Sequence, residues 1–496
     1  MITSRIKKLT ITIATIAIGM EVQAQLLNSA YFIDGTSSRH TLNPAFANEQ
    51  GYVSIPALGS LNVKMQGNFG LQDVLFKNPE SGYYNRTFMH PDVSVNDALS
   101  GFSKGNNRIL ADVDITLLAA GFRSFGGYST IEVKEKTSAG IQLPYELLEF
   151  AKDINNRNYT FDGIHARAMS FVEIAMGHSH AINEQLRIGA KLKALLGMAR
   201  TDLNIDNMKA NFVGDEWDIT SGEAEANVNM KGIMFKNTTS DYNYRSGSYE
   251  HVDLGETDVD GFGIGGFGMG VDLGAEFQVM ENLKVSAALN DLGFIAWSNN
   301  YLLKQKAQTF TFDGFHDVAV KSETTEKGDI LDDQVDNYSD QLSDFVSLQN
   351  EGDTGGKTTM LAATLNIGGE YTLPMYEPLT IGLLGQHRFN GDFSWTEGRL
   401  SANWKPLNWL DGCVNFCVGS YAVSTGWIVN IHPKGFNFFI GMDHILGKMS
   451  KEFIPLSSNA NFSMGMAITW GGSKKEEINS RHNSSRTRKT GRPRKS

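Results

Sequence analysis

The feature that most constrains this chain is a repeated hairpin pattern, in which two apolar alternating runs flank a short polar turn. The pattern occurs in 175–197, 274–293 and 368–385, and in a shorter form in 427–443. Each run has the length of a tilted β-strand that crosses a bilayer, roughly 9–11 residues. Much longer polar segments lie between the hairpins. Short turns at one end and long loops at the other are typical of an outer-membrane β-barrel.

The 496 residues show no linker that would divide them, and one large barrel accounts for the whole length. Beyond the N-terminus no apolar run reaches the about 20 residues that a transmembrane helix needs. We therefore expect an all-β fold, a transmembrane antiparallel up-and-down β-barrel. About fourteen strands are expected, an even number as bacterial barrels require. Both termini are then periplasmic, and residues 205–260 and 298–357 lie outside.

Alternation and turn residues locate the individual elements. The first three strands are expected near 52–66, 110–122 and 128–137, followed by a short helix at Pro144–Asp153. Later strands are expected to flank turns at Asn183-Glu184, Glu281-Asn282, Pro374–Pro378, Asn390-Gly391-Asp392, Lys405–Gly412 and Pro433-Lys434-Gly435, and the last strand to end at Trp470. The long segments are expected to carry extra strands at Ala224–Val228 and Thr309–Val320.

The N-terminus has the composition of a secretory signal peptide. Three basic residues precede the apolar run Leu9–Met20, and Val22-Gln23-Ala24 resembles a small-residue cleavage site. The alternative is a membrane anchor, for which the apolar run is too short. We expect residues 1–24 to be removed after Ala24 and the mature protein to reach the outer membrane. Removal changes the formal charge from −11 to about −13.

The C-terminal segment 473–496 differs from the rest. It holds nine Lys or Arg against Glu476 and Glu477, and it has almost no aliphatic residues. It cannot bury a core, so we expect a disordered basic periplasmic tail. After export it would meet no nucleic acid, and an envelope protein or anionic envelope polymer is the partner that fits. A purely solubilising tail is the alternative.

No catalytic, cofactor-binding or metal-binding residues are expected. Gly263, Gly265, Gly268 and Gly270 do not open a helix as a dinucleotide loop requires, and they read as the small-residue face of a strand. His178 and His180 share a strand face, but a metal site needs at least a third ligand. The acidic run 329–344 lacks the spacing of an EF-hand and reads as a solvated loop, with weak divalent-cation binding as the alternative.

Motifs of hydrolases are also absent. The sequence has no G-x-S-x-G elbow and no zinc-protease helix motif, so we expect a protein that is not an enzyme. Cys413 and Cys417 lie four apart in an expected strand, about 13 Å along it. A disulfide needs Cα atoms within about 7 Å, so we expect free, packed thiols.

The stretch Leu42-Asn43-Pro44-Ala45-Phe46-Ala47 resembles the start of FadL-type (OmpP1/TodX-like) outer-membrane transporters. Similar openings occur in barrel proteins associated with type IX secretion. Phe171–Gly197 and Gly268–Trp297 resemble an uncharacterised outer-membrane barrel family related to both. The FadL-type resemblance implies that residues 25–50 form a hatch that plugs the barrel, held by Asn43, Pro44 and Ala45. The barrel itself would then span 51–472.

Two functions are compatible with these features. The first is a plugged passive transporter or binder of an apolar or amphipathic small molecule, embedded in outer-membrane lipid. The second is a structural or assembly barrel that anchors envelope or secretion partners, which the basic tail favours. A continuous path past residues 25–50 distinguishes the first from the second.

Overall fold

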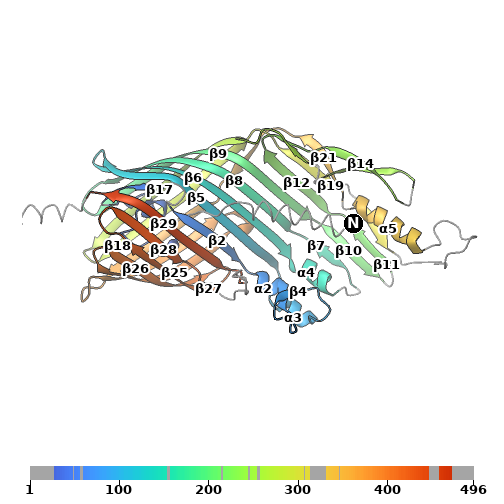
Figure 1. Ribbon diagram of the computed structural model, residues 1–496, viewed down its shortest axis with the longest axis horizontal. Helices are drawn as coiled ribbons and strands as arrows, with labels where there is room; N and C mark the ends of the chain where they lie inside the picture. The colour runs from blue at the N-terminus through green and yellow to red at the C-terminus, as the bar shows by residue number, and fades with distance from the viewer. Residues whose placement is uncertain are drawn as a thin grey trace, which may run out of the picture.

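The computed structural model describes residues 27–48, 50–55, 60–153, 157–213, 216–243, 246–253, 257–305, 308–312, 331–345, 347–445 and 457–471. Within these residues, fourteen antiparallel strand positions form a barrel (Figure 1). In chain order they are β1 (Gly51–Ser54) with β2 (Leu61–Gly67), β5 (Asn106–Ser124), β6 (Gly127–Pro144), β8 (Ile164–Ala181), β9 (Leu186–Asp206), β17 (Gly266–Met280), β18 (Leu283–Trp297), β22 (Lys357–Met360) with β23 (Ala363–Thr372), β24 (Leu379–Phe389), β25 (Trp395–Leu407), β26 (Leu410–Gly419), β27 (Val423–Ile431), β28 (Phe436–Met442) and β29 (Ala460–Trp470).

The barrel closes through its first strand position. Both β1 and β2 pair with β29 on one side and with β5 on the other. Closure leaves no free edge in the wall, which is the condition for a sheet to sit in a bilayer. The predicted all-β barrel and its strand number are therefore confirmed.

The wall is much taller on one side than on the other. The strands β5, β6, β8 and β9 have 18–21 residues, whereas β27 has 9 and β28 has 7. Residues 186–197 of β9 pair with β17, but 199–206 pair with β12 (Glu223–Met230). The sheet continues from β12 to β19 (Tyr301–Gln305) and β21 (Leu348–Asp353), so the tall side branches beyond the barrel.

Small elements cover the end of the barrel that carries the long loops (Figure 1). They are the helices α2 (Leu71–Val74), α3 (Val95–Ser100), α4 (Tyr145–Lys152) and α5 (Leu331–Phe345), the 3-10 turn η3 (Gly391–Phe393), and the strands β3 (Leu75–Lys77), β4 (Tyr84–Thr87), β7 (Tyr159–Phe161), β10 (Met208–Val213), β11 (Glu216–Thr220), β13 (Ile233–Met234), β14 (Asn237–Asp241), β15 (Ser248–Val252), β16 (Asp258–Val259) and β20 (Thr309–Phe312). Aromatic residues of β7 and β10 pack with α4 into a separate apolar cluster.

The predicted turns and the alternation of faces are confirmed. Every expected short turn joins two neighbouring barrel strands. A further tight turn, between β5 and β6, has positive φ at Phe125 and Gly126. In β18, Val285 points outward and is 40% exposed, while the Ser286 hydroxyl meets the Tyr31 hydroxyl inside the barrel. The expected helix at Pro144–Asp153 is α4, with Pro144 at the N-cap position.

The loop predictions are confirmed in part. The extra strand expected at Ala224–Val228 lies within β12, and Thr309–Val320 is a strand over Thr309–Phe312. Residues 313–330, like the signal peptide, Gln25, Leu26 and the basic tail, lie outside the described residues. The polar stretch after the first strand, for which no elements were expected, contains α2, α3, β3 and β4.

The acidic run 329–344, expected to be a solvated loop, is instead a helix from Leu331 onward, α5, so that expectation is wrong. The other motifs discounted on sequence grounds lie in or beside the wall. Gly268 and Gly270 belong to β17, where Phe267 and Met269 alternate with them and point outward. Gly263 and Gly265, expected on the same strand, precede its first residue, Gly266, so the predicted strand begins later than expected. The rings of His178 and His180 stack 6.0 Å apart near the short-turn end. Across the described ranges, no three His, Cys, Asp or Glu side chains gather as a metal site would require. None of the helices described is long and apolar enough to cross a membrane.

Candidate functional site

Residues 27–48, here called the luminal segment, lie inside the barrel and are almost entirely buried. The 3-10 turns η1 (Asn28–Ala30) and η2 (Arg39–Thr41) fold the segment compactly. Its apolar side chains pack against inward-facing residues of four wall strands, namely Leu384, Cys413, Ile428 and Phe439. The segment has no period of its own, so contacts with the wall determine its path.

Asn43 joins the luminal segment to two wall strands. Its amide nitrogen donates to the carbonyl oxygens of Ala275 in β17 and Ala287 in β18, both at 3.3 Å. Its side-chain oxygen accepts from the backbone N–H of Ala45 at 2.9 Å. The Ser179 hydroxyl of β8 donates in turn to the Ala45 carbonyl at 2.7 Å. Asn43 is fully buried, and these three hydrogen bonds satisfy both ends of its amide.

Two wall glycines allow this close approach. A Cβ on Gly274 would lie 2.0 Å from the side-chain oxygen of Asn43, and one on Gly189 would lie 2.1 Å from the carbonyl oxygen of Pro44. Real Cβ atoms do not come so close to other heavy atoms. Asn43 and Pro44 therefore contact the bare backbone of β17 and β9.

Polar side chains of the wall hold the luminal segment elsewhere around the lumen. The carboxylate of Asp443 accepts from the backbone N–H and the hydroxyl of Ser29 at 2.7 and 2.5 Å. The amides of Asn290 and Asn366 donate to the carbonyl oxygen of Leu42 at 2.9 and 3.0 Å. Further hydrogen bonds join Tyr31 to Ser286, Gly35 to Asp411, Ser37 to Asn437 and His40 to Tyr52.

A network of buried charges covers the inner wall beside the luminal segment. Its members come from β6, β8, β9, β17 and β18, and they are Glu132, Lys134, Lys136, Glu173, Lys191, Lys193, Asp272 and Asp291. Four ammonium groups meet four carboxylates, so the network as a whole is neutral. Lys193, for example, lies 2.7 Å from Asp272 and 2.6 Å from Asp291. A buried charge without a partner is strongly destabilising, and the one-to-one balance avoids that penalty.

A β-bulge in β18 turns two consecutive side chains into the lumen. The pairing of β17 with β18 shifts register here, and Asp291 has a φ of 59°. Asp is among the residues that tolerate this left-handed conformation. Asn290 then reaches the luminal segment, while Asp291 reaches Lys136 at 2.9 Å and Lys193. Bulges often re-aim side chains near functional sites.

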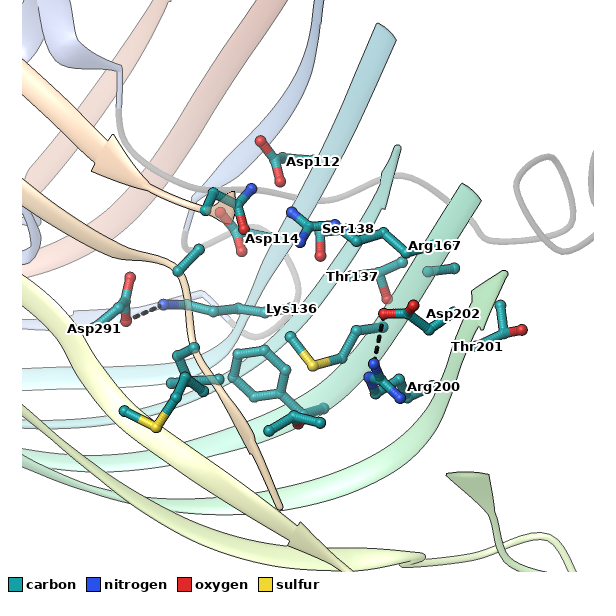
Figure 2. Close-up of a pocket in the computed structure, with 18 of the residues that line it drawn as sticks. Asp112, Asp114, Lys136, Thr137, Ser138, Arg167, Arg200, Thr201, Asp202 and Asp291 are labelled. Carbon is teal, nitrogen blue, oxygen red and sulfur yellow. Dashed lines mark hydrogen bonds and ion pairs between the residues drawn. The ribbon is translucent and has the colours of Figure 1, made fainter. Parts of the chain in front are cut away.

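A cavity of about 330 Å³ lies inside the barrel, lined mainly by residues of β5, β6, β8, β9, β18 and β22 (Figure 2). This volume is near the lower end of the range for small-molecule sites, roughly 300–1,000 Å³. Eight charged side chains line it: Asp112, Asp114, Lys136, Arg167, Arg200, Asp202, Asp291 and Arg388. Most pair within the set, with Arg200 at 2.5 Å from Asp202, Lys136 at 2.9 Å from Asp291 and Arg388 at 3.5 Å from Asp112.

Part of the cavity lining is apolar. Met169, Phe171 and Leu361 form this part, and the last two continue into a buried cluster with Leu195, Ile295 and Trp297. Leu361 lies between β22 and β23, where the regular pairs with β18 stop between Asn290–Thr364 and Phe294–Met360. One backbone hydrogen bond remains in this gap, from the N–H of Leu361 to the carbonyl oxygen of Gly293 at 2.9 Å. The cavity thus combines paired charges, an apolar wall and a local break in strand pairing.

A second polar cluster anchors the opposite part of the lumen. Arg399 is 2% exposed and donates to Asn415 and to the carboxylate of Glu397, the latter at 3.4 Å. His444, just past the end of β28, is neutral at pH 7 because burial lowers its pKa to about 4. Cys413 and Cys417 face the same region as free, buried thiols, as predicted.

The charged lumen was not predicted, although the sequence contains an indication of it. Glu132, Lys134 and Lys136 alternate along β6, and Lys191 and Lys193 alternate along β9, so each set shares one face. Charged residues on the lipid face of a barrel are destabilising, so such a face must point inward. Which carboxylate meets which lysine depends on strand register, which alternation does not supply.

The sequence matches the profile of a family of unknown function, DUF5723, over residues 44–443. No protein of curated function matches it. Solved structures similar to the chain include the Ralstonia pickettii toluene transporter TbuX, at 11% identity and a TM-score of 0.38, covering 91% of this chain and 94% of that one. A Pseudomonas aeruginosa FadL homologue follows at 8% identity and a TM-score of 0.37, covering 91% and 98%.

The translocator domain of the Neisseria meningitidis autotransporter NalP is similar at 7% identity and a TM-score of 0.31, covering 85% of this chain and 88% of that one. The solved structures similar to this chain therefore include FadL-type barrels, the family that residues 42–47 resemble. All three TM-scores are below 0.5, so these similarities carry no information on function.

Proposed function

Because the chain belongs to DUF5723, a family of unknown function, we propose a role from the geometry of its lumen: an outer-membrane barrel that binds and passively moves a small amphipathic molecule. The observation that carries this proposal is the cavity, whose lining combines eight charged groups with the apolar side chains of Met169, Phe171 and Leu361. An amphipathic ligand satisfies both surfaces, whereas a purely apolar ligand would strip water from the charges without replacing it.

The outer surface of the barrel supports a place in the membrane. Large apolar side chains point outward from many strands, with exposed fractions of 69% for Leu192, 62% for Leu383 and 65% for Val414. At the short-turn end, Tyr376, Trp404, Trp409 and Trp470 are between 46% and 51% exposed. An apolar band flanked by aromatic residues is what a lipid bilayer and its interface favour.

The proposed path has three steps. The long loops admit the ligand, the cavity holds it, and the ligand then leaves past the luminal segment or through the wall at Leu361. The break in pairing between β18 and β22–β23 supports the lateral exit, because fewer backbone hydrogen bonds have to open there. Asn43, Pro44 and Ala45 are proposed to hold the segment as a hatch, through the contacts with Gly189 and Gly274.

A deletion of residues 26–48 tests this function. The wild type should conduct poorly in planar bilayers, because the segment fills the lumen. The deleted protein should show larger single-channel conductance and admit large hydrophilic antibiotics, since about fourteen strands enclose a lumen that leaks unless filled. A deleted protein that inserts normally and stays closed refutes the hatch.

A structural or assembly role is the second candidate. The basic segment 473–496, with nine Lys or Arg against two Glu, supports it because such a tail fits an acidic envelope partner. This role predicts no change in conductance on deletion of 26–48, and loss of a bound envelope protein on deletion of the tail. The two deletions therefore separate the candidates.

A further inference from the structure

Asp114 is a buried carboxylate that faces the cavity without a partner. It lies on β5, 8% exposed, and makes no hydrogen bond and no ion pair within the part of the chain that the structure describes. The cavity cation on the neighbouring strand, Lys136, is already 3.1 Å from Glu173 and 2.9 Å from Asp291. Asp114 therefore has acceptor atoms directed at the cavity and no cation of its own.

Arg167 is the complementary case. It lies on β8, lines the same cavity, and places its guanidinium 4.4 Å from the centre of the Phe393 ring. Among the described residues, no carboxylate lies within 4.0 Å of it. Stacking on an aromatic ring leaves the edge of a guanidinium, with its N–H donors, free for an anion. Figure 2 shows Asp114, Lys136 and Arg167 extending into one space from three strands.

The remaining charges of the cavity neutralise one another. Arg200 pairs with Asp202, Arg388 with Asp112, and Lys136 with Asp291. What is left is one carboxylate and one guanidinium. A simple anion would satisfy Arg167 and leave Asp114 unpaired, and a simple cation would do the reverse. A buried polar group that loses water without gaining a partner is unfavourable, so neither ion suits the whole cavity.

We propose that this cavity binds a small zwitterion with an aliphatic chain, whose amine pairs with Asp114 and whose carboxylate pairs with Arg167. The aliphatic part packs on Met169, Phe171 and Leu361, which line the same cavity. The ligand adds no net charge to a neutral cavity. This inference names the ligand class of the proposed transport function and rests on that function for its physiological meaning.

Calorimetric titration of the full chain in lipid nanodiscs tests the proposal with four six-carbon probes. Two are zwitterions, 2-aminohexanoate and 6-aminohexanoate, which place the charges at different separations. The others are hexanoate and hexylamine, which carry one charge each. At least one zwitterion should bind about tenfold more tightly than either single-charge probe, as expected for one additional charge-assisted hydrogen bond. Hexanoate binding as tightly as both zwitterions, or no binding of either zwitterion, overturns the proposal.

Two substitutions assign the charges. Asp114→Asn should weaken the preferred zwitterion about tenfold and leave hexanoate unchanged, while Arg167→Gln should weaken the zwitterion and hexanoate alike. Glu281→Gln, the same loss of charge in an exposed turn at the far end, is the control and should change nothing. Equal affinities in all three variants overturn the assignment. The comparison of probes on the wild type decides the ligand class even if a variant does not fold.

Transport is measured separately, as uptake of the same probes into proteoliposomes. A zwitterion that binds but does not cross contradicts the transport function and leaves the ligand class standing. If the deletion of 26–48 opens the pore but the protein prefers hexanoate, the transport function stands and the zwitterion proposal is contradicted.

Discussion

Gly274→Ala should displace the luminal segment without any change to the segment itself. The new Cβ would lie 2.0 Å from the side-chain oxygen of Asn43 and 2.9 Å from Cδ of Pro44. The wall cannot retreat, because β17 is held by ladders to β9 on one side and to β18 on the other. The segment must therefore move away from the strand, and Asn43 moves with it.

The magnitude follows from the contacts that are lost. Asn43 makes two hydrogen bonds to the wall, to Ala275 and Ala287, whereas its third, to Ala45, lies within the segment and moves with it. Each of the two contributes about 0.5–1.5 kcal/mol net, and overpacking adds about 1–3 kcal/mol. The docked state should lose about 2–6 kcal/mol in total. Even the lower value raises the ratio of undocked to docked segment about 27-fold, because 1.4 kcal/mol is a factor of ten.

Single-channel recording and limited proteolysis measure this displacement. Gly274→Ala should open to a larger conductance more often than wild type, and residues 27–48 should become sensitive to added protease. Gly270→Ala is the matched control, four residues away on the same strand, where the added Cβ would meet its nearest atom at 3.5 Å, an ordinary contact. If Gly274→Ala stays as closed and as protease-resistant as Gly270→Ala, the contact of Asn43 with the wall does not keep the lumen shut.

Two further predictions concern the barrel in its membrane. Leu400 points outward from the middle of β25 and Val423 from the start of β27. In lipid, Leu400→Arg should therefore cost about 2–4 kcal/mol of folding free energy and Val423→Arg about 0–1 kcal/mol, as measured by denaturant titration in vesicles. Equal losses would contradict the depth assigned to the two residues. Single cysteines at Asn183 and Val335, introduced after both native cysteines are replaced by Ser, should differ in labelling on intact cells, with only position 335 reached by a reagent that does not cross the membrane; labelling of 183 alone would invert the barrel.

The barrel could be predicted from the sequence because its determinants are local. Two-residue alternation shows which side chains share a face, and turns such as Glu281-Asn282 and Pro433-Lys434-Gly435 show where a strand reverses. The parity of the strands then follows from closure. Each of these steps needs only a few neighbouring residues, and each is found in the structure.

The lumen could not be predicted in the same way, because its contacts join distant parts of the chain. Lys136 and Asp291 are 155 residues apart and meet only when the sheet has closed with a particular register. The bulge at Asp291 also interrupts alternation, and a strict two-residue period would send one of Asn290 and Asp291 outward. Two consecutive polar residues inside an apolar strand are the one local indication of that bulge.

The bulge links the two parts of the lumen that the functional proposals treat separately. Asn290 donates to Leu42 of the luminal segment, and the adjacent Asp291 forms ion pairs that reach the cavity through Lys136. A left-handed residue other than Gly costs on the order of 1–3 kcal/mol and persists only where surrounding contacts impose it. Here those contacts come from both sides, the segment at Asn290 and the lysines at Asp291. Displacement of the luminal segment from Asn290 removes one of the two restraints on the bulge. It should therefore alter the position of Asp291 and its ion pairs at the charged wall of the cavity.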